Sequence, residues 1–236
     1  MPDDPSLGRS QGPRSLDERL QSVRDRVAEA CRRSDRTPDS VTTIVVTKFQ
    51  PASLVRALYD LGVRDVGENR HQEAQAKAAE VSDLDELTWH FVGQLQSNKA
   101  KQVTAYSRVV HSVDRDALAD ALANADRRVD CFLQINLTEN PERGGVSPQG
   151  LEPLAEHVLG DARLRLLGVM AVAPLGEQPR AAFSRLRELS DRLQRLAPGA
   201  SAISAGMSQD FPDAIAEGAT HLRIGTAITG NRPARG

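Results

Sequence analysis

The sequence predicts a single-domain α/β protein: a (β/α)8 TIM barrel with an extra helix before its first strand. Three observations support this fold class. Short apolar, often β-branched runs alternate with segments of helical spacing. Eight such runs occur within 236 residues, a length that closed barrels commonly reach as one domain. No internal repeat or low-complexity tract is present. An open doubly wound sheet remains the alternative from this pattern alone.

The amino-terminal region divides into a tail and a helix. Residues 1–14 are rich in proline, glycine and acidic residues, so we expect a disordered tail rather than a secretory signal. The helix follows at 16–33, where Leu16, Leu20, Val23 and Val27 recur at helical spacing. The barrel domain is expected to span residues 15–232.

The strand and helix assignments follow hydrophobic periodicity. The run 41–47 is β-branched and uninterrupted, which is typical of a parallel strand buried on both faces. Further strands are expected at 63–66, 89–92, 108–111, 130–136, 164–170, 200–204 and 220–224. Helices are expected between them at 51–61, 69–81, 98–104, 114–123, 148–159, 179–196 and 210–217. A last helix should open at Thr226.

Composition excludes several classes of function. The 30 basic and 32 acidic residues are scattered, without the basic face that nucleic acid requires. Cys31 and Cys131 lack metal-ligand spacing, as do the histidines, so we predict no metal site and free thiols in a reducing cytoplasm. The most apolar segment, 164–175, is too short to span a membrane and contains Arg165.

The candidate functional residues follow the predicted strands, because the loops at the carboxyl ends of barrel strands form the active site. Lys48 ends the first strand, where a desolvated amine could attack an aldehyde. The alternative is a lysine that simply extends into solvent. Ser204 and Gly206 follow strand seven, and Gly225 and Thr226 follow strand eight.

The loops after strands seven and eight are the usual phosphate sites of such barrels. Gly225 and Thr226 offer backbone N–H groups, a hydroxyl and a helix N-terminus to an anion. The structural alternative is that Ser208 and Thr226 only cap helices. Because phosphate-type loops and a strand-end lysine occur together, we favour a phosphorylated aldehyde as the ligand. Arg223 could face the same mouth, or form a core ion pair.

Six ordered motifs carry a resemblance to a known family. They are VVTKFQP, VGENRHQEA, WHFVGQLQSNK, LLGVMAVAP, SAGMSQD and LRIGTAITG. With these motifs, the chain resembles the pyridoxal phosphate homeostasis protein family over about residues 16–230. That family shares its barrel with the amino-terminal domain of alanine racemase. The resemblance implies a fold-type III barrel for pyridoxal 5′-phosphate (PLP).

The resemblance also implies a role for each candidate residue. Lys48 would carry PLP as a Schiff base. Ser204 and the backbone of Gly225 and Thr226 would hold the phosphate. Arg223 would lie at the pyridine nitrogen, which stays neutral because a guanidinium does not give up its proton. Asn69 would contact the ring. His90 is as readily interpreted as a structural histidine as it is as a ligand-binding residue.

The expected function is a PLP carrier or buffer that affects amino-acid and keto-acid balance, with no catalytic residue. A racemase needs a second acid/base across the ring from the lysine, and the sequence offers no obvious supplier. The alternatives are a PLP-dependent racemase or lyase, and a cofactor-free barrel that binds a sugar phosphate. We expect a cytoplasmic monomer whose partners are PLP and, as receivers of it, PLP-dependent apoenzymes.

Overall fold

Eight parallel strands form a closed barrel in which each strand pairs with its neighbours in sequence and β1 pairs with β8. The structure is a computed structural model that describes residues 15–140 and 142–231. The strands are β1 (Thr42–Val46), β2 (Asp65–Glu68), β3 (Thr88–Phe91), β4 (Val109–Val113), β5 (Val129–Gln134), β6 (Leu164–Met170), β7 (Ala202–Ser204) and β8 (His221–Ile224). The predicted closed barrel is therefore confirmed.

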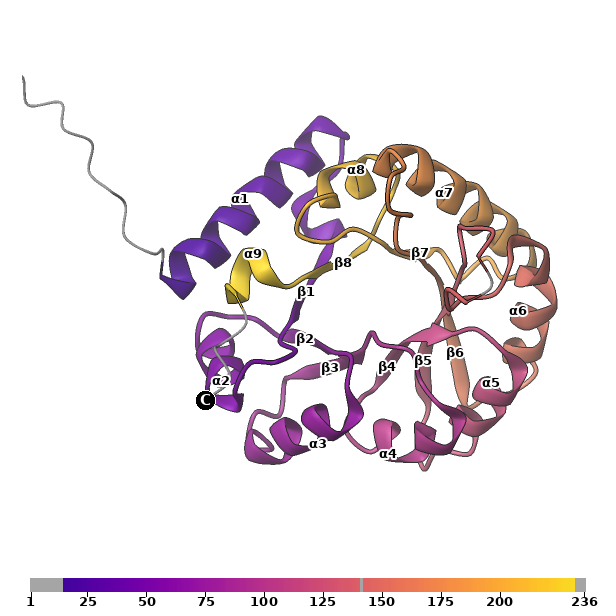
Figure 1. Ribbon diagram of the computed structural model, residues 1–236, viewed down its shortest axis with the longest axis horizontal. Helices are drawn as coiled ribbons and strands as arrows, with labels where there is room; N and C mark the ends of the chain where they lie inside the picture. Colours follow the sequence, from indigo (N-terminus) through magenta and orange to yellow (C-terminus); the bar gives the residue numbers. More distant parts are fainter. Residues whose placement is uncertain (1–14, 141, 232–236) are drawn as a thin grey trace, which may run out of the picture.

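Helices surround this barrel as an outer ring (Figure 1). They are α1 (Leu16–Arg33), α2 (Ala52–Asp60), α3 (His71–Glu80), α4 (Ala100–Thr104), α5 (Asp116–Ala123), α6 (Leu151–Leu159), α7 (Pro179–Leu196), α8 (Phe211–Ala216) and α9 (Thr226–Thr229). Short 3-10 turns at Pro38–Ser40, Ser97–Lys99 and Pro148–Gly150 precede β1, α4 and α6. None of the helices in the described ranges is long and apolar enough to cross a membrane.

The extra amino-terminal helix has the predicted bounds. Ser15 and Glu18 form a capping box, in which each side chain accepts a hydrogen bond from the other residue's backbone N–H. The buried side of α1 packs against α8 and α9 (Figure 1). Residues 1–14, for which a disordered tail is predicted, lie outside the described residues.

Most element bounds differ from the sequence prediction by one to three residues; β2, expected at 63–66, lies at Asp65–Glu68. Two of these differences have local polar reasons. Strand β5 ends at Gln134 instead of residue 136, because the Asn136 side chain bonds the loop that follows, accepting from the Thr138 N–H at 2.9 Å. Helix α3 begins at His71 instead of residue 69, because Arg70 is still extended at the cap position. Both shifts place polar residues in loops at the barrel mouth.

The core has two parts. The larger lies between the sheet and the helices. Inside the barrel, Val109, Phe132 and Met170 form a small apolar cluster. Buried polar side chains share this interior, including His90, His111 and Ser204. The barrel centre is therefore partly polar, which a purely structural core does not require.

Gly168 allows a close approach between β6 and β7. Its φ is +154°, and a Cβ at this position would lie 1.8 Å from the carbonyl oxygen of Ala202, its partner in β7. We expect Gly168→Ala to lower the free energy of unfolding by about 2–3 kcal/mol, since backbone must move. Urea denaturation measures this loss. Gly199→Ala is the control, because a Cβ there meets nothing within 4 Å; equal effects would contradict the steric argument.

Candidate functional site

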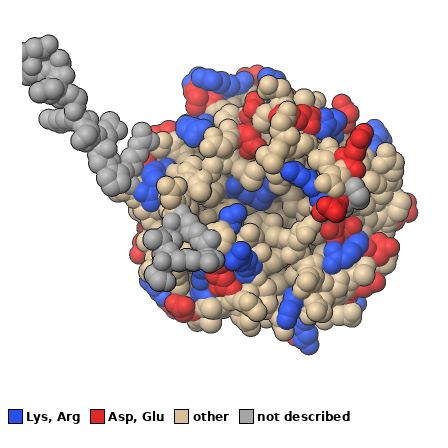
Figure 2. Space-filling view, in the orientation of Figure 1, with Lys and Arg blue, Asp and Glu red and all other residues tan. Residues whose placement is uncertain are grey.

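Lys48 lies at the mouth of the barrel, in a turn two residues after the end of β1. In β1, Ile44 and Val46 share a face with Gly67, where an added Cβ would lie 3.0 and 3.4 Å from their side chains. Side chains of a strand alternate between its two faces, and Lys48 comes two residues after Val46, so it continues the face of Ile44 and Val46. Its side chain is exposed, with Nζ 6.0 Å from the centre of the Phe49 ring. The amine is therefore accessible to a ligand. Figure 2 shows a hollow at the centre of the molecule's face, with Lys and Arg side chains on its walls.

A buried ion-pair cluster between β2 and α3 holds the backbone on both sides of this lysine. Lys77 Nζ donates to the Thr47 carbonyl oxygen at 2.7 Å, to Glu68 at 2.7 Å and to Glu73 at 2.8 Å. Glu73 in turn accepts a hydrogen bond from the Phe49 N–H. Phe49 has a φ of +66°, a conformation that needs such support in a non-glycine residue. We call Glu68, Glu73 and Lys77 the α3 clamp.

Burial affects the charges of the α3 clamp. The Lys77 and Glu68 side chains are 6% and 1% exposed. Burial raises the pKa of the Glu68 carboxyl, while its hydrogen bond to Lys77 opposes that rise. One Glu68 oxygen, Oε2, has no hydrogen-bond partner among the described residues. Sequence reasoning did not find this cluster, because Lys77 reads as an ordinary surface residue of an Ala- and Glu-rich helix.

Ser204 and Arg223 lie together inside the barrel. Arg223 Nη1 donates to Ser204 Oγ at 2.6 Å, and Nη2 donates to the Ala171 carbonyl oxygen at 2.8 Å. Burial lowers the pKa of Arg223 to about 10, so the side chain stays cationic near neutral pH. The core ion pair considered from sequence is not what the geometry shows, since both guanidinium contacts are to neutral oxygens.

The loop after β8 opens a short helix toward the mouth. Gly225 occupies the cap position of α9, and Thr226 is its first residue. The first N–H groups of a helix have no partner within the helix, so they suit an anion. Ser208 Oγ accepts from the Ala227 N–H at 3.3 Å, which joins the loop after β7 to this turn. Ser208 is thus a further candidate for the phosphate site; sequence reasoning treated it as a helix cap, yet Asp210 holds that position.

Asn69 follows β2 beside the same opening. Its side-chain Oδ1 is buried and has no hydrogen-bond partner in the described part of the chain. Gly93 makes room for this loop, because a Cβ there would lie 2.4 Å from the Asn69 carbonyl oxygen. A buried acceptor without a partner is costly, so a ligand that donates a hydrogen bond here would stabilise the site.

The two tyrosines lie away from the strand ends. Tyr59 belongs to α2 and packs under the Arg64 guanidinium, 3.9 Å from its ring centre. Tyr106 follows α4, and its hydroxyl lies 3.5 Å from His71 Nδ1. Burial raises the pKa of Tyr106 well above its usual value. Neither tyrosine lies on a barrel strand or directly follows one. No group of three potential metal ligands occurs within residues 15–140 and 142–231.

The two cysteines are buried against apolar side chains and should be chemically inert in the folded protein. Both are 0% exposed, and burial raises the pKa of Cys131 to about 12 and also raises that of Cys31. We expect no labelling by iodoacetamide at pH 7.5 (about one unit below a free thiol's pKa) until the protein unfolds. Mass spectrometry with and without guanidinium measures this; rapid labelling of the native state would show an open thiol site.

Comparisons with known proteins agree with this geometry. The pattern of the alanine racemase N-terminal domain family matches residues 19–233. A relative from Pseudomonas aeruginosa, called pyridoxal phosphate homeostasis protein, is 41% identical over 92% of this chain and 96% of its own length. A relative of the same name from Aquifex aeolicus is 39% identical over 91% and 97%.

Solved structures give the same result. PipY of Synechococcus elongatus with PLP bound superposes with a TM-score of 0.79 at 36% identity, over 92% of this chain and 100% of its own. The same protein without PLP gives a TM-score of 0.81 at 37% identity, with equal coverage. Alanine racemase from Corynebacterium glutamicum, at 15% identity, a TM-score of 0.63 and 92% and 62% coverage, shares the fold.

Proposed function

The chain belongs to the pyridoxal phosphate homeostasis protein family, and on this basis we propose that it binds PLP at the mouth of its barrel. Its role is the intracellular homeostasis of PLP, as a carrier or buffer that affects amino-acid and keto-acid balance. One observation carries the proposal. The exposed amine of Lys48, after β1, and the turn at Thr226, whose backbone N–H groups suit an anion, both lie at the mouth of the barrel.

The residues present suit PLP. Lys48 would hold it covalently as a Schiff base. The turn at Gly225 and Thr226, with Ser204 or Ser208, would receive the phosphate. The Oδ1 atom of Asn69, which lacks a partner among the described residues, would accept a hydrogen bond from the ring. Bound PLP supplies an electrophilic carbon and a conjugated ring that stabilises negative charge.

Arg223 would orient the pyridine ring and limit its chemistry. A guanidinium donates hydrogen bonds without giving up its proton, so a ring nitrogen that faces it stays neutral. A neutral ring withdraws electrons less strongly. Together with tyrosines that lie away from the strand ends, this favours a carrier without catalytic activity. An amino-acid racemase or lyase is the alternative function that the experiment below also tests.

We further propose that residues 15–232 form one domain and that the protein acts in the cytoplasm as a monomer. Free, buried thiols suit that compartment. PLP-dependent apoenzymes are the expected receivers of the cofactor. Size-exclusion chromatography with light scattering tests the oligomeric state.

The first experiment is an absorbance spectrum from about 300 to 500 nm, before and after borohydride, followed by peptide mass mapping. We expect a visible band that reduction converts into an adduct on Lys48. No band, even after PLP is added, would contradict the proposal and favour a barrel that binds a sugar phosphate. Racemase activity in the loaded protein would contradict the carrier role.

A further inference from the structure

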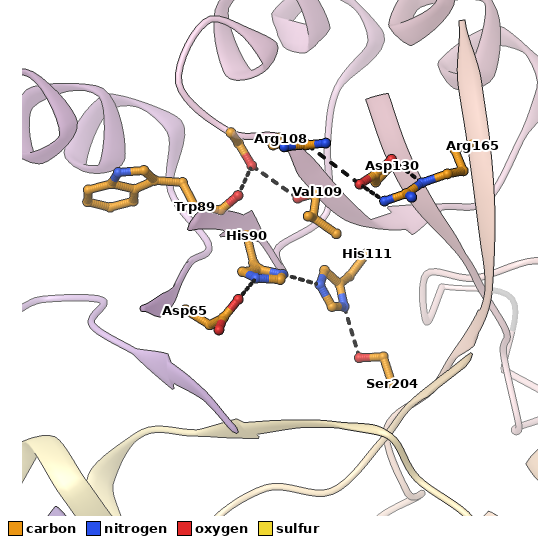
Figure 3. A network of polar contacts seen from close by, with 10 residues as sticks. Asp65, Trp89, His90, Arg108, Val109, His111, Asp130, Arg165 and Ser204 are labelled. Carbon is orange, nitrogen blue, oxygen red and sulfur yellow. Dashed lines mark hydrogen bonds and ion pairs between the residues drawn. The ribbon is translucent and has the colours of Figure 1, made fainter. Parts of the chain in front are cut away.

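A continuous chain of hydrogen bonds runs through the barrel interior from β2 to β8. His90 Nε2 lies 2.9 Å from Asp65 Oδ1, and His90 Nδ1 lies 3.0 Å from His111 Nε2. His111 Nδ1 lies 2.9 Å from Ser204 Oγ, which accepts from Arg223 Nη1 at 2.6 Å. Figure 3 shows Asp65, the two histidines and Ser204 in this order. We call Asp65, His90 and His111 the histidine relay.

The ends of the chain fix its direction. A guanidinium only donates hydrogen bonds, and an ionised carboxylate only accepts them. When both histidines are neutral, these ends leave one arrangement: the Ser204 hydroxyl donates to His111, His111 donates to His90, and His90 donates to Asp65. Each histidine then carries its hydrogen on Nε2. Burial lowers the pKa of His111 well below its usual value, which agrees with a neutral ring.

This direction has a consequence for the site. Ser204 gives its only hydrogen to His111, deep in the barrel, so it has none to offer a ligand in the mouth. An anionic oxygen would need that hydrogen, since an oxygen lone pair on Ser204 would repel it. The predicted role of Ser204 toward a phosphate therefore requires the relay to change state.

We propose that the histidine relay positions the Ser204 hydroxyl, and that uptake of one proton reverses the relay and frees this hydroxyl to donate to an anionic ligand. In the reversed state His90 carries two hydrogens and pairs as a cation with Asp65. Its Nδ1–H donates to His111 Nε2, and His111 Nδ1–H donates to Ser204 Oγ. Ser204 then accepts from both His111 and Arg223, and its own hydrogen is available. This proposal rests on the proposed PLP site.

The charges around the relay favour placing the proton on His90. Asp65 is the carboxylate in contact with it, and its side chain is 31% exposed, which gives the proton a route from solvent. Burial lowers the pKa of His111, and the nearby His90, Arg223 and His221 lower it further. His221 itself has a pKa lowered to about 4 by burial and by His90.

The other inward groups do not compete for this proton. From β5 and β6, Asp130 and Arg165 pair with each other at a bidentate contact (Figure 3). Phe132 and Met170, on the same two strands, are apolar. Burial lowers the pKa of Arg223, and the nearby Asp210 carboxylate opposes that shift. Of the histidines in the relay, His90 is the one in direct contact with a carboxylate, that of Asp65.

The relay predicts that ligand binding takes up a proton. Pyridoxine 5′-phosphate is the probe, because it lacks the aldehyde and cannot form a Schiff base. Protons that are taken up or released during covalent attachment therefore do not contribute to the measurement. Calorimetry in buffers of different ionisation heat should show uptake approaching one proton. The Kd should rise by up to about tenfold per pH unit over the range in which the free protein has lost this proton. Affinity is thus full at low pH and lost as the pH rises.

Asp65→Asn is the informative variant, because an amide still accepts from His90 but no longer stabilises its cation. We expect its proton uptake to fall toward that of the ligand alone and its Kd to lose the steep pH dependence. Asp120→Asn is the matched control, because it removes the carboxylate charge from a surface pair of the same chemistry, in which His157 Nε2 lies 2.7 Å from Asp120 Oδ1. Equal behaviour of the two variants would overturn the proposal.

A second measurement does not depend on any ligand. In protein labelled with ¹⁵N-histidine, His90 and His111 should show neutral Nε2–H tautomers at high pH. As the pH falls, His90 should become doubly protonated while His111 changes to the Nδ1–H tautomer. A His111 that keeps its hydrogen on Nε2 throughout would overturn the relay even if PLP binds. A relay that switches in a protein that binds no PLP would instead contradict only the proposed function.

Discussion

Lys48→Ala is expected to abolish covalent attachment of PLP while leaving the fold intact. The side chain is exposed and lies beyond the end of β1, so its loss removes no core packing. We expect the free energy of unfolding to change by less than about 0.5 kcal/mol, the usual size of a surface effect. After incubation with PLP and reduction with borohydride, peptide mapping should find no adduct on the β1 peptide.

The control is Lys101→Ala, which removes a lysine whose side chain is 73% exposed and lies on α4, away from the mouth. It should take up PLP like the unaltered protein. An insoluble Lys48→Ala protein would mean that the lysine has a structural role. A soluble one that still forms the adduct elsewhere would move the attachment site to another amine.

Lys77→Met is expected to have the largest effect on stability. Removing the cation leaves Glu68 buried beside Glu73 without their shared partner. Breaking a buried ion pair in this way costs about 3–5 kcal/mol. The Thr47 carbonyl oxygen also loses its donor, directly before Lys48. Guanidinium denaturation should show the destabilisation, and stopped-flow absorbance should show slower uptake of PLP.

A double variant separates charge from shape. Lys77→Met combined with Glu68→Gln removes the buried negative charge as well, so it should be more stable than Lys77→Met alone while uptake stays slow. Lys101→Met serves as the surface control, because Lys101 lies 3.8 Å from Asp126 in an exposed pair. If Lys77→Met matched this control in stability, the α3 clamp would contribute little to the fold.

The fold could be predicted because each strand carries its own signal. A run such as 41–47 is apolar and β-branched whatever surrounds it, and alternation with helices leaves few topologies to consider. The predicted end of β5 was wrong because a side chain there competes with the backbone ladder. That side chain is Asn136, whose amide donates to two loop carbonyl oxygens, at Asn140 and Arg143, both at 2.8 Å.

Only part of the candidate site could be predicted from the sequence. Lys48 and Thr226 could be found because strand ends converge by topology, and the loops after β7 and β8 form phosphate sites in such folds. The α3 clamp and the histidine relay depend on side chains that meet across 4 to 93 residues of sequence. A search for short-range ligand spacing does not find His90 and His111, because they meet inside the barrel and are 21 residues apart in the sequence.

The contact between the two ends of the chain bears on how the protein is made. Arg19 on α1 donates to the Ile228 carbonyl oxygen at 2.6 Å, and β1 pairs with β8 along four residues. The first elements to leave the ribosome therefore wait for the last ones. A nascent chain displays Lys48 long before it contains the turn at Thr226. The two parts of the proposed site therefore come together only after β8 has been made.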